Sequence, residues 1–441
     1  MKVIIAGAGI GGLTAALSLH EAGIDVEVYE GVARMSPLGV GINCLPHAVR
    51  ELTELGLEEA LMAAGVATRE LVYTNKYGQQ IWREDRGRYA GYDWPQVSLH
   101  RGRLQMILYE AALERLGPER IHLDHALLRY EQDASGVTAH FGSRHLLPSG
   151  GSGAQAHAEP ASRGSARADI LVAADGIHSA ARRQRHPDEG PPLWNGAVLW
   201  RGVTYARPFL SGASMIMAGH EWQKFVCYPI SAPREDGLQE INWIAERKFR
   251  DRSGGFKPED WNRPGRLEEF LPAFETWDFG WLDAPGLIRG APGCFEFPMV
   301  DRDPLEAWAD GRVTLLGDAA HPMYPIGSNG ASQAILDARV LSWRLATESD
   351  PLTALALYEE ERRPATAKLV LANRSNGPEK VMQMAEERAP DGFEHVHDVI
   401  DAEELARVAN EYKRIAGFDR EQLAARHSYS VRRDTARADS R

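Results

Sequence analysis

The start of the chain reads as a strand, a helix and a second strand. Residues 2–6 (KVIIA) form a short apolar run typical of a fully buried strand. Residues 10–22 contain good helix formers with apolar positions on two faces, and Gly23 follows as a stop signal. Residues 26–30 (VEVYE) favour another strand. This order predicts a βαβ unit and therefore a parallel sheet.

The same signals predict further helices and buried strands along the chain. Helix starts and stops are marked by proline and glycine, and buried strands by short apolar runs. The predicted helices cover 46–55, 101–116 and about 330–346, and the predicted strands cover 168–175 (ADILVAAD) and 312–318 (RVTLLGD).

Two stretches depart from this pattern. Residues 149–168 are rich in Gly, Ser and Ala and have no apolar face, which predicts a flexible surface loop between two hairpin strands. Between about 190 and 300, aromatic-rich runs at 198–204, 214–218 and 225–230 are typical of antiparallel strands. The predicted fold is therefore α/β, with a second, mixed or antiparallel sheet.

Composition narrows the class of protein. The chain has 441 residues, with 50 Lys and Arg against 62 Asp and Glu, so its formal net charge is −12. This acidic balance argues against a nucleic-acid partner, which would require a basic surface. Cys44, Cys227 and Cys294 fit neither a disulfide framework nor a four-ligand zinc site, so we expect a reducing, cytoplasmic compartment and no metal. No apolar run is long enough to span a membrane.

A glycine pattern of the G-x-G-x-x-G type joins the first strand to the first helix. Gly7 permits a tight turn, Gly9 lets a pyrophosphate approach the backbone, and Gly12 lets the helix pack closely on the sheet. Glu30 ends the next strand, where a carboxylate can accept hydrogen bonds from ribose hydroxyls. The pattern alone leaves nicotinamide and flavin dinucleotides open. The residues predicted to bind the dinucleotide here are Gly7, Gly9, Ile10, Gly11, Gly12 and Glu30.

Two later segments distinguish the two cofactors. The first is DGIHS (175–179) with Arg182, and the second is GDAAHP (317–322), followed by GSNG (327–330). Together with the first glycine pattern, they resemble the signatures of the single-component FAD-dependent aromatic hydroxylases. The resemblance covers roughly residues 1–375. It implies FAD as cofactor and a Rossmann-like FAD-binding domain. No second dinucleotide fingerprint is present, so a separate nicotinamide domain is not expected.

Three other segments are similar to one branch of this family, which contains the 5-methylphenazine-1-carboxylate monooxygenase. They are LGVGIN (38–43), WRGVT (200–204) and MVDRDPL (299–305). The resemblance implies that NADH or NADPH reduces the flavin, and that reduced flavin and O₂ form a C4a-hydroperoxide. This intermediate would hydroxylate an aromatic or heteroaromatic small molecule, with a phenazine as the first compound to test.

The resemblance also implies roles for individual residues. Asp318 would hold a ribityl hydroxyl of FAD or, alternatively, cap a turn. Arg101 would pair with the FAD phosphates, unless it is merely solvated. The helix that begins at Gly330 would direct its dipole at the flavin ring. Ser328-Asn329 departs from the family, which usually has a second glycine there. The cofactor-binding residues added in this way are Gly41, Ile42, Arg101, Asp318, Gly330 and Ala331.

No catalytic acid–base residue is expected, because the cofactor carries the chemistry and the protein binds, orients and excludes water. We do not assign His321 as a base. For Asp175, capping a helix and serving the cofactor are equally supported, and the role of Arg182 is open. The tryptophans between 190 and 300 are mostly expected in the core. The candidate pocket-wall residues are Trp200, Tyr228, Met323, Tyr324 and Pro325.

These assignments predict a discontinuous domain organisation. An FAD-binding domain is expected from three segments, a substrate domain from two, and a helical tail at the end that packs on the outside. The tail could also contribute to a homodimer, and its basic end, 432–441, is expected to fray. The segments are 1–72, 96–185 and 293–375 for the FAD-binding domain, 73–95 and 186–292 for the substrate domain, and 376–441 for the tail.

Three rival functions remain open at this stage. A flavin oxidase or dehydrogenase on the same scaffold would remove hydride without inserting oxygen. A nicotinamide-only dehydrogenase would hold no flavin. An FAD-binding redox sensor would have no small-molecule substrate.

Overall fold

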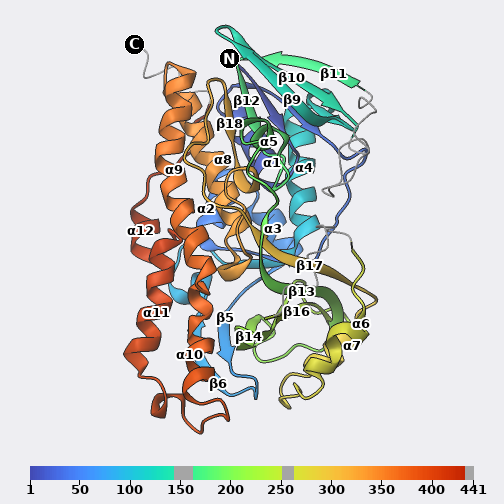
Figure 1. Cartoon of the computed structure of the whole chain (residues 1–441), viewed down its shortest axis with the longest axis vertical. Helices are drawn as coiled ribbons and strands as arrows, with labels where there is room; N and C mark the ends of the chain where they lie inside the picture. The colour runs from blue at the N-terminus through green and yellow to red at the C-terminus, as the bar shows by residue number, and fades with distance from the viewer. Residues whose placement is uncertain (144–161, 251–262, 433–441) are drawn as a thin grey trace.

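The computed structural model of the chain describes residues 1–143, 162–250 and 263–432. A parallel sheet forms the centre of the upper half of the molecule in Figure 1. The strands predicted at 2–6, 26–30, 168–175 and 312–318 all lie in this sheet, and their apolar residues are buried. The strand order is β18 (Val313–Leu315), β12 (Ile170–Ala173), β1 (Lys2–Ala6), β2 (Asp25–Glu30) and β8 (Ile121–Leu123).

Helices cover one face of this sheet, and the three-stranded sheet described in the next paragraph packs on the other face. Contacts between helices join α1 to α8 and α4, and α8 to α2 and α9. The helices predicted at 10–22, 46–55, 101–116 and 330–346 are all confirmed, with ends that differ by at most one residue. The helices of this half are α1 (Ile10–Glu21), α2 (Pro46–Glu54), α3 (Glu58–Ala64), α4 (Arg101–Leu116), α5 (Ala180–Arg185), α8 (Gly330–Thr347) and α9 (Pro351–Arg374).

A three-stranded antiparallel sheet corrects the predicted loop over 149–168. It consists of β9 (Ala126–Asp133), β10 (Gly136–Gly142) and β11 (Ser162–Ala168). The loop prediction is wrong for Ser162–Ala168, because this edge strand pairs with β10 through backbone hydrogen bonds and needs no apolar face. The expected pairing of two hairpin strands is confirmed. Residues 149–161 lie outside the described residues.

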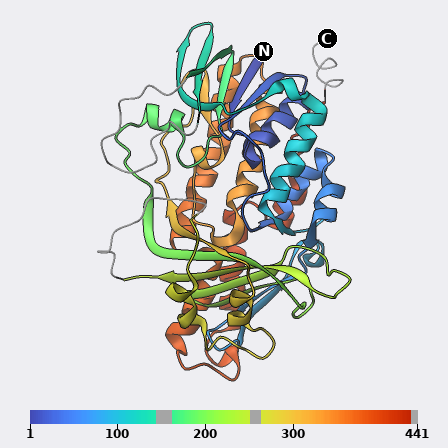
Figure 2. The ribbon, with the colours of Figure 1, turned by 90° about the vertical axis from the view of Figure 1, so that its right-hand side faces the viewer.

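A seven-stranded mixed sheet crosses the molecule below the parallel sheet (Figure 2). The antiparallel strands predicted at 198–204, 214–218 and 225–230 are confirmed within it, and only β14 and β5 pair in parallel. Its order is β17 (Cys294–Asp301), β13 (Leu193–Ala206), β16 (Gln239–Lys248), β15 (Gln223–Pro229), β14 (Ser214–His220), β5 (Glu70–Thr74) and β6 (Gln80–Asp85).

The two faces of the mixed sheet have different partners, because side chains alternate along each strand. One face carries Ile216, Cys227 and Trp243 and is covered by α6 (Leu267–Phe270) and α7 (Ala284–Arg289). The opposite face carries Met217 and Tyr228. This second face is the one that turns toward the FAD-binding half, as the site below shows.

A small antiparallel sheet lies where the two halves meet. It joins β3 (Gly41–Cys44), β7 (Val97–His100) and β4 (Gly65–Ala67). The strand β3 contains Gly41 and Ile42, and β7 leads directly into α4 at Arg101. This small sheet therefore carries or adjoins three of the predicted cofactor-binding residues.

The C-terminal part is helical, as predicted, and packs on its own chain. It consists of α10 (Lys380–Arg388), α11 (Ala402–Ile415) and α12 (Arg420–Ala425). The first two cover the Met217 face of the mixed sheet with residues such as Met382 and Leu405. The last described residues run along α2, where Arg50 donates to the carbonyl oxygens of Leu423 and Arg426, both at 2.8 Å. The basic end beyond Arg432 lies outside the described residues.

None of the helices that the structure describes is both long and apolar enough to cross a membrane.

Candidate active site

The glycine turn between β1 and α1 has the geometry that its sequence predicts. Gly7 has φ +108°, a conformation that disfavours side chains, and a Cβ there would lie 2.4 Å from the Ala174 carbonyl oxygen. A Cβ on Gly12 would lie 2.0 Å from the Gly7 carbonyl oxygen. A Cβ on Gly11 would press on Leu316 and Ala334, so this glycine lets α1 approach α8.

Gly9, in contrast, borders open space. A Cβ on Gly9 would meet no atom within 4 Å, and among the described residues no side chain caps the N-terminus of α1 that follows it. The free amide groups and the dipole of this helix therefore remain available to an anionic ligand. Ile10, the first residue of the helix, is buried behind them.

Glu30 lies against the same turn. Its carboxylate accepts hydrogen bonds from the backbone amides of Ala8 (2.7 Å) and Val32 (2.9 Å). The amide side chain of Gln105 holds the Ala8 carbonyl oxygen from the other side, at 2.8 Å. Each carboxylate oxygen keeps a second lone pair, so Glu30 can brace the turn and still accept a ribose hydroxyl.

The GDAAHP segment lies beside this turn, as the contact of Gly11 with Leu316 shows. Asp318 remains accessible to solvent although protein surrounds it. This burial raises the pKa of Asp318, against the opposing charges of His321 and Arg101. From this combination we infer that Asp318 borders an internal recess.

Arg101 borders the same recess from α4. Its side chain is also accessible, and the surrounding protein lowers the pKa of its guanidinium while Asp318 raises it. Arg101 has no ion-pair partner within the described part of the chain. Gly330, at the start of α8, completes the space, since a Cβ there would meet no atom within 4 Å. Ala331 follows it and is only partly buried.

Comparison with known proteins identifies the family of this chain. The model of the FAD binding domain family matches residues 1–192 and 298–373. A phenazine 1,6-dicarboxylic acid hydroxylase of Lysobacter antibioticus is 45% identical, over 84% of this chain and 89% of that protein. The chain belongs to the FAD-dependent aromatic hydroxylases. FAD is therefore the cofactor, which excludes the nicotinamide-only dehydrogenase.

Two further similarities agree with this membership. A 3-amino-4-hydroxybenzoate 2-monooxygenase of Streptomyces platensis is 33% identical, over 86% of this chain and 88% of that protein. A solved salicylate hydroxylase complex shares the fold with a TM-score of 0.71 at 22% identity, covering 96% of this chain and 97% of that chain.

The residues of this hydroxylase fit the cofactor that the family implies. Gly9 and Gly330 stand at the starts of α1 and α8, which pack on each other, and the accessible Asp318 and Arg101 interact electrostatically. A dinucleotide needs an uncapped helix start for its diphosphate and polar groups for its sugars, and both are present here.

The loop that leads into α8 contains Ser328 and Asn329, where the family resemblance implies a second glycine. Ser328 adopts φ +57°, in the left-handed region, although it is not a glycine. Such a residue costs about 1–2 kcal/mol and needs support from its surroundings. Asn329 supplies it by donating to the carbonyl oxygen of Gly327 and to the hydroxyl of Tyr412, both at 3.0 Å.

The DGIHS motif and Arg182 have structural roles in this arrangement. Asp175 accepts a hydrogen bond from the Ala180 amide at 2.7 Å at the start of α5, which fits the structural one of its two expected roles. Its Oδ1 has no hydrogen-bond partner among the described residues, so the cofactor role stays a prediction. Arg182 is 1% exposed and donates to the carbonyl oxygens of Ala319 (3.1 Å) and Ala320 (2.9 Å). Arg182 therefore holds the GDAAHP segment in place.

His321 is likewise held by neighbours. Its Nε2 lies 2.5 Å from the Asp337 carboxylate, which also accepts from Arg362 at 2.7 Å. The ring is 3% exposed and belongs to this buried network.

The mixed sheet clamps Gly41 at the edge of the recess. Gly41 donates its amide to Asn242 Oδ1 at 2.7 Å, and Arg201 donates to its carbonyl oxygen at 2.8 Å. A Cβ on Gly41 would lie 2.8 Å from the ring of Tyr228, whose pKa burial raises to about 12. Ile42 follows in β3 and is partly buried.

Arg201 and Asn242 were missed by the sequence reasoning. Arg201 stands in the WRGVT segment beside Trp200, so strand alternation could have placed it on the opposite face. Its Nε and the Nδ2 of the fully buried Asn242 have no hydrogen-bond partner among the described residues. Both atoms are buried beside Gly41.

The expected pocket wall is corrected at one position. Trp200 stacks on Phe270 at 4.7 Å between ring centroids, on the α6 side of the sheet and away from Gly41. Alternation along β13 turns its ring to that side. Tyr228 lies at the recess, as described above.

The three other wall candidates lie in the loop after GDAAHP. Tyr324 packs against Leu199 and Met299 of the mixed sheet, while Met323 packs near Tyr412, and Pro325 is exposed. The loop therefore runs between the sheet and the start of α8, where a substrate wall is expected.

Proposed function

We propose that this FAD-dependent monooxygenase hydroxylates an aromatic carboxylic acid of the phenazine class. The observation that carries the proposal is the 45% identity, over most of both chains, to a hydroxylase named for phenazine 1,6-dicarboxylic acid. The 33% identical relative is named for an aminohydroxybenzoate, which is also an aromatic carboxylate. The two unpartnered donors on Arg201 and Asn242 support an anionic or polar ligand above Gly41.

The chain's own residues bind and orient. In this proposal the first turn of α1 holds the FAD diphosphate over Gly9, Glu30 and Asp318 accept sugar and ribityl hydroxyls, and Arg101 neutralises phosphate charge. The N-terminus of α8 at Gly330 favours negative charge on the facing ring edge.

When bound, FAD supplies hydride acceptance from NADH or NADPH and the activation of O₂. No side chain is proposed as a catalytic acid or base. The mixed sheet and the 322–330 loop exclude water from the substrate, which limits wasteful release of H₂O₂.

We further propose a reducing, cytoplasmic compartment. Its support is that Cys44, Cys227 and Cys294 are all free and buried.

Isotope labelling tests the proposed reaction. The purified holoenzyme is incubated with phenazine-1,6-dicarboxylate, NAD(P)H and ¹⁸O₂, and the product mass is measured. One ¹⁸O atom per product, with NAD(P)H consumption that the phenazine stimulates, is the expected result. Oxidised product without ¹⁸O would identify an oxidase, and the absence of any stimulation by aromatic acids would favour a redox sensor.

A further inference from the structure

A small cavity lies between the mixed sheet, α11 and the loop that leads into α8. Gly327 and Ser328 form its wall on the α8 side, and Met215 and Met217 form part of its apolar wall. Its free space suffices for about one water molecule. The polar residues of its lining are Tyr73, Glu84, Arg86, Gln96, Tyr412 and Lys413.

The charges in this lining are unequal. Glu84 lies 2.5 Å from the Arg86 guanidinium and 2.6 Å from Lys413 Nζ. Burial favours a neutral carboxyl, but the two cations outweigh it and lower the pKa of Glu84. One carboxylate therefore faces two cations, and these three side chains keep one positive charge in excess.

Several polar atoms of the lining also lack partners. Arg86 Nε, the Tyr73 hydroxyl and Gln96 Oε1 are buried without a hydrogen bond to any described residue. Tyr73 is 1% exposed and Gln96 is 2% exposed. A buried polar group left unpaired costs about 1–3 kcal/mol. Two unpaired donors beside an excess positive charge suit a ligand with acceptor oxygens and a negative charge.

We propose that this cavity binds the carboxylate of the aromatic substrate, with Arg86 and Lys413 as its cationic anchors. The inference rests on the proposed function, because it assigns a place to the acid group of that substrate. Entry of the carboxylate-bearing edge of the ring requires the flexible side chains of Met215 and Met217 to shift. Gly327 and Ser328 then lie between this edge and the start of α8.

Binding measurements with a matched pair of ligands test the proposal. The dissociation constants of phenazine-1-carboxylate and phenazine-1-carboxamide are measured on the FAD-loaded enzyme by equilibrium dialysis. Lys413→Met leaves Glu84 paired with Arg86, so the fold keeps its contact. It should weaken binding of the acid about tenfold or more and change binding of the amide less than about twofold. Lys76→Met removes an ion pair with Glu386 outside the cavity and serves as control.

A second variant has the opposite expected sign. Glu84→Gln removes the anion that competes with the ligand for both cations, so it should tighten binding of the acid and leave the amide unchanged. Equal binding of acid and amide by the unsubstituted enzyme would overturn the proposal, as would equal effects of Lys413→Met on both ligands. A clear acid preference without hydroxylated product would instead refute the proposed function and retain this site.

Discussion

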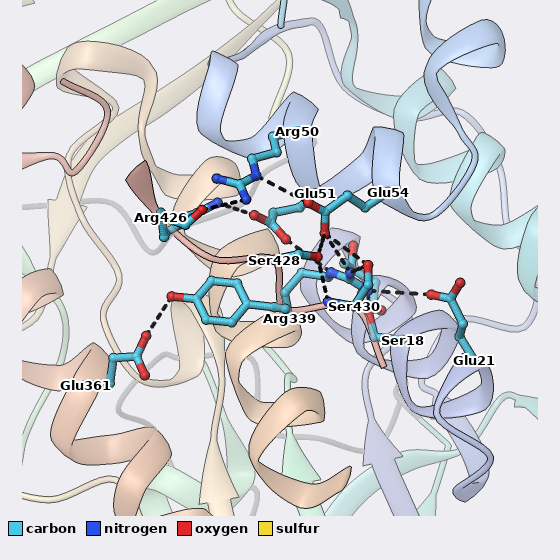
Figure 3. Close-up of polar contacts among 12 residues, drawn as sticks. Ser18, Glu21, Arg50, Glu51, Glu54, Arg339, Glu361, Arg426, Ser428 and Ser430 are labelled. Atoms are coloured by element: carbon cyan, nitrogen blue, oxygen red, sulfur yellow. Dashed lines mark hydrogen bonds and ion pairs between the residues drawn. The ribbon is translucent and has the colours of Figure 1, made fainter. Parts of the chain in front are cut away.

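Arg339 provides a sharp test of what holds the FAD-binding half together. It lies within α8, is 1% exposed, and its guanidinium contacts Glu51 and Glu54, both at 3.2 Å, and Ser18 at 3.2 Å (Figure 3). These partners belong to α2 and α1, so one cation joins three helices. Arg339→Met would leave the fully buried Glu51 with Arg426 as its remaining cationic partner.

The expected cost follows from this arrangement. Removing one member of a buried ion pair costs about 3–5 kcal/mol, and the remaining partner of Glu51 places this case near 3 kcal/mol. Urea unfolding of the holoenzyme, followed by tryptophan fluorescence, measures the change in the free energy of unfolding. Arg344→Met is the control, because Arg344 lies on the same helix in partly exposed pairs and should cost at most about 1 kcal/mol.

The pH dependence separates a lost charge from a lost side chain. Burial raises the pKa of Glu51, and Arg426 and Arg339 lower it, so losing Arg339 raises it further. An acid whose folded-state pKa is raised binds its proton more tightly in the folded state. The folded state therefore loses stability as the pH rises above the unfolded pKa of about 4.3. The cost of Arg339→Met should be larger at pH 7.5 than at pH 5. If Arg339→Met lowered the free energy of unfolding no more than Arg344→Met at both pH 5 and pH 7.5, the reasoning would be refuted.

Four other substitutions address the cofactor site and the segments that support it. Glu30→Ala and Asp318→Ala should each lower the flavin content per protein after gel filtration, and unchanged content in both would contradict the site. Arg182→Met should cost about 3 kcal/mol of unfolding free energy and also release flavin, because it frees the GDAAHP carbonyl groups; stability loss without flavin loss would limit its role to the fold. Gly327→Ala should destabilise more than Gly212→Ala in thermal unfolding, since both have similar positive φ but only Gly327 has no room for a Cβ; equal losses would show that strain alone acts.

The elements with local signals could be predicted from the sequence. Residues Arg101–Leu116 form α4 as expected, because Gly117 and Pro118 end the helix wherever it packs. The strand Lys2–Ala6 is apolar throughout and fits only the middle of a covered sheet. The close contact of Gly12 with the Gly7 carbonyl oxygen is of the same local kind, whereas the contact that would exclude a Cβ at Gly7 comes from Ala174, far along the chain.

Residues that meet across long sequence distances could not be predicted in this way. Alternation along β13 assigns Trp200 and Arg201 to opposite faces of the sheet, but it does not predict which face meets the FAD-binding half. The hydrogen bond from Arg201 to Gly41 decides this, and it joins residues 160 positions apart. Tyr412 is the stronger case. A charged helical tail gave no reason to place a hydroxyl beside Gly327, yet that hydroxyl accepts from Asn329 and supports a left-handed Ser328 where the family usually has glycine. The hydrogen bond between Asn329 of the loop and Tyr412 of the tail therefore links the departure in the loop to the position of the tail, and neither segment predicts it alone.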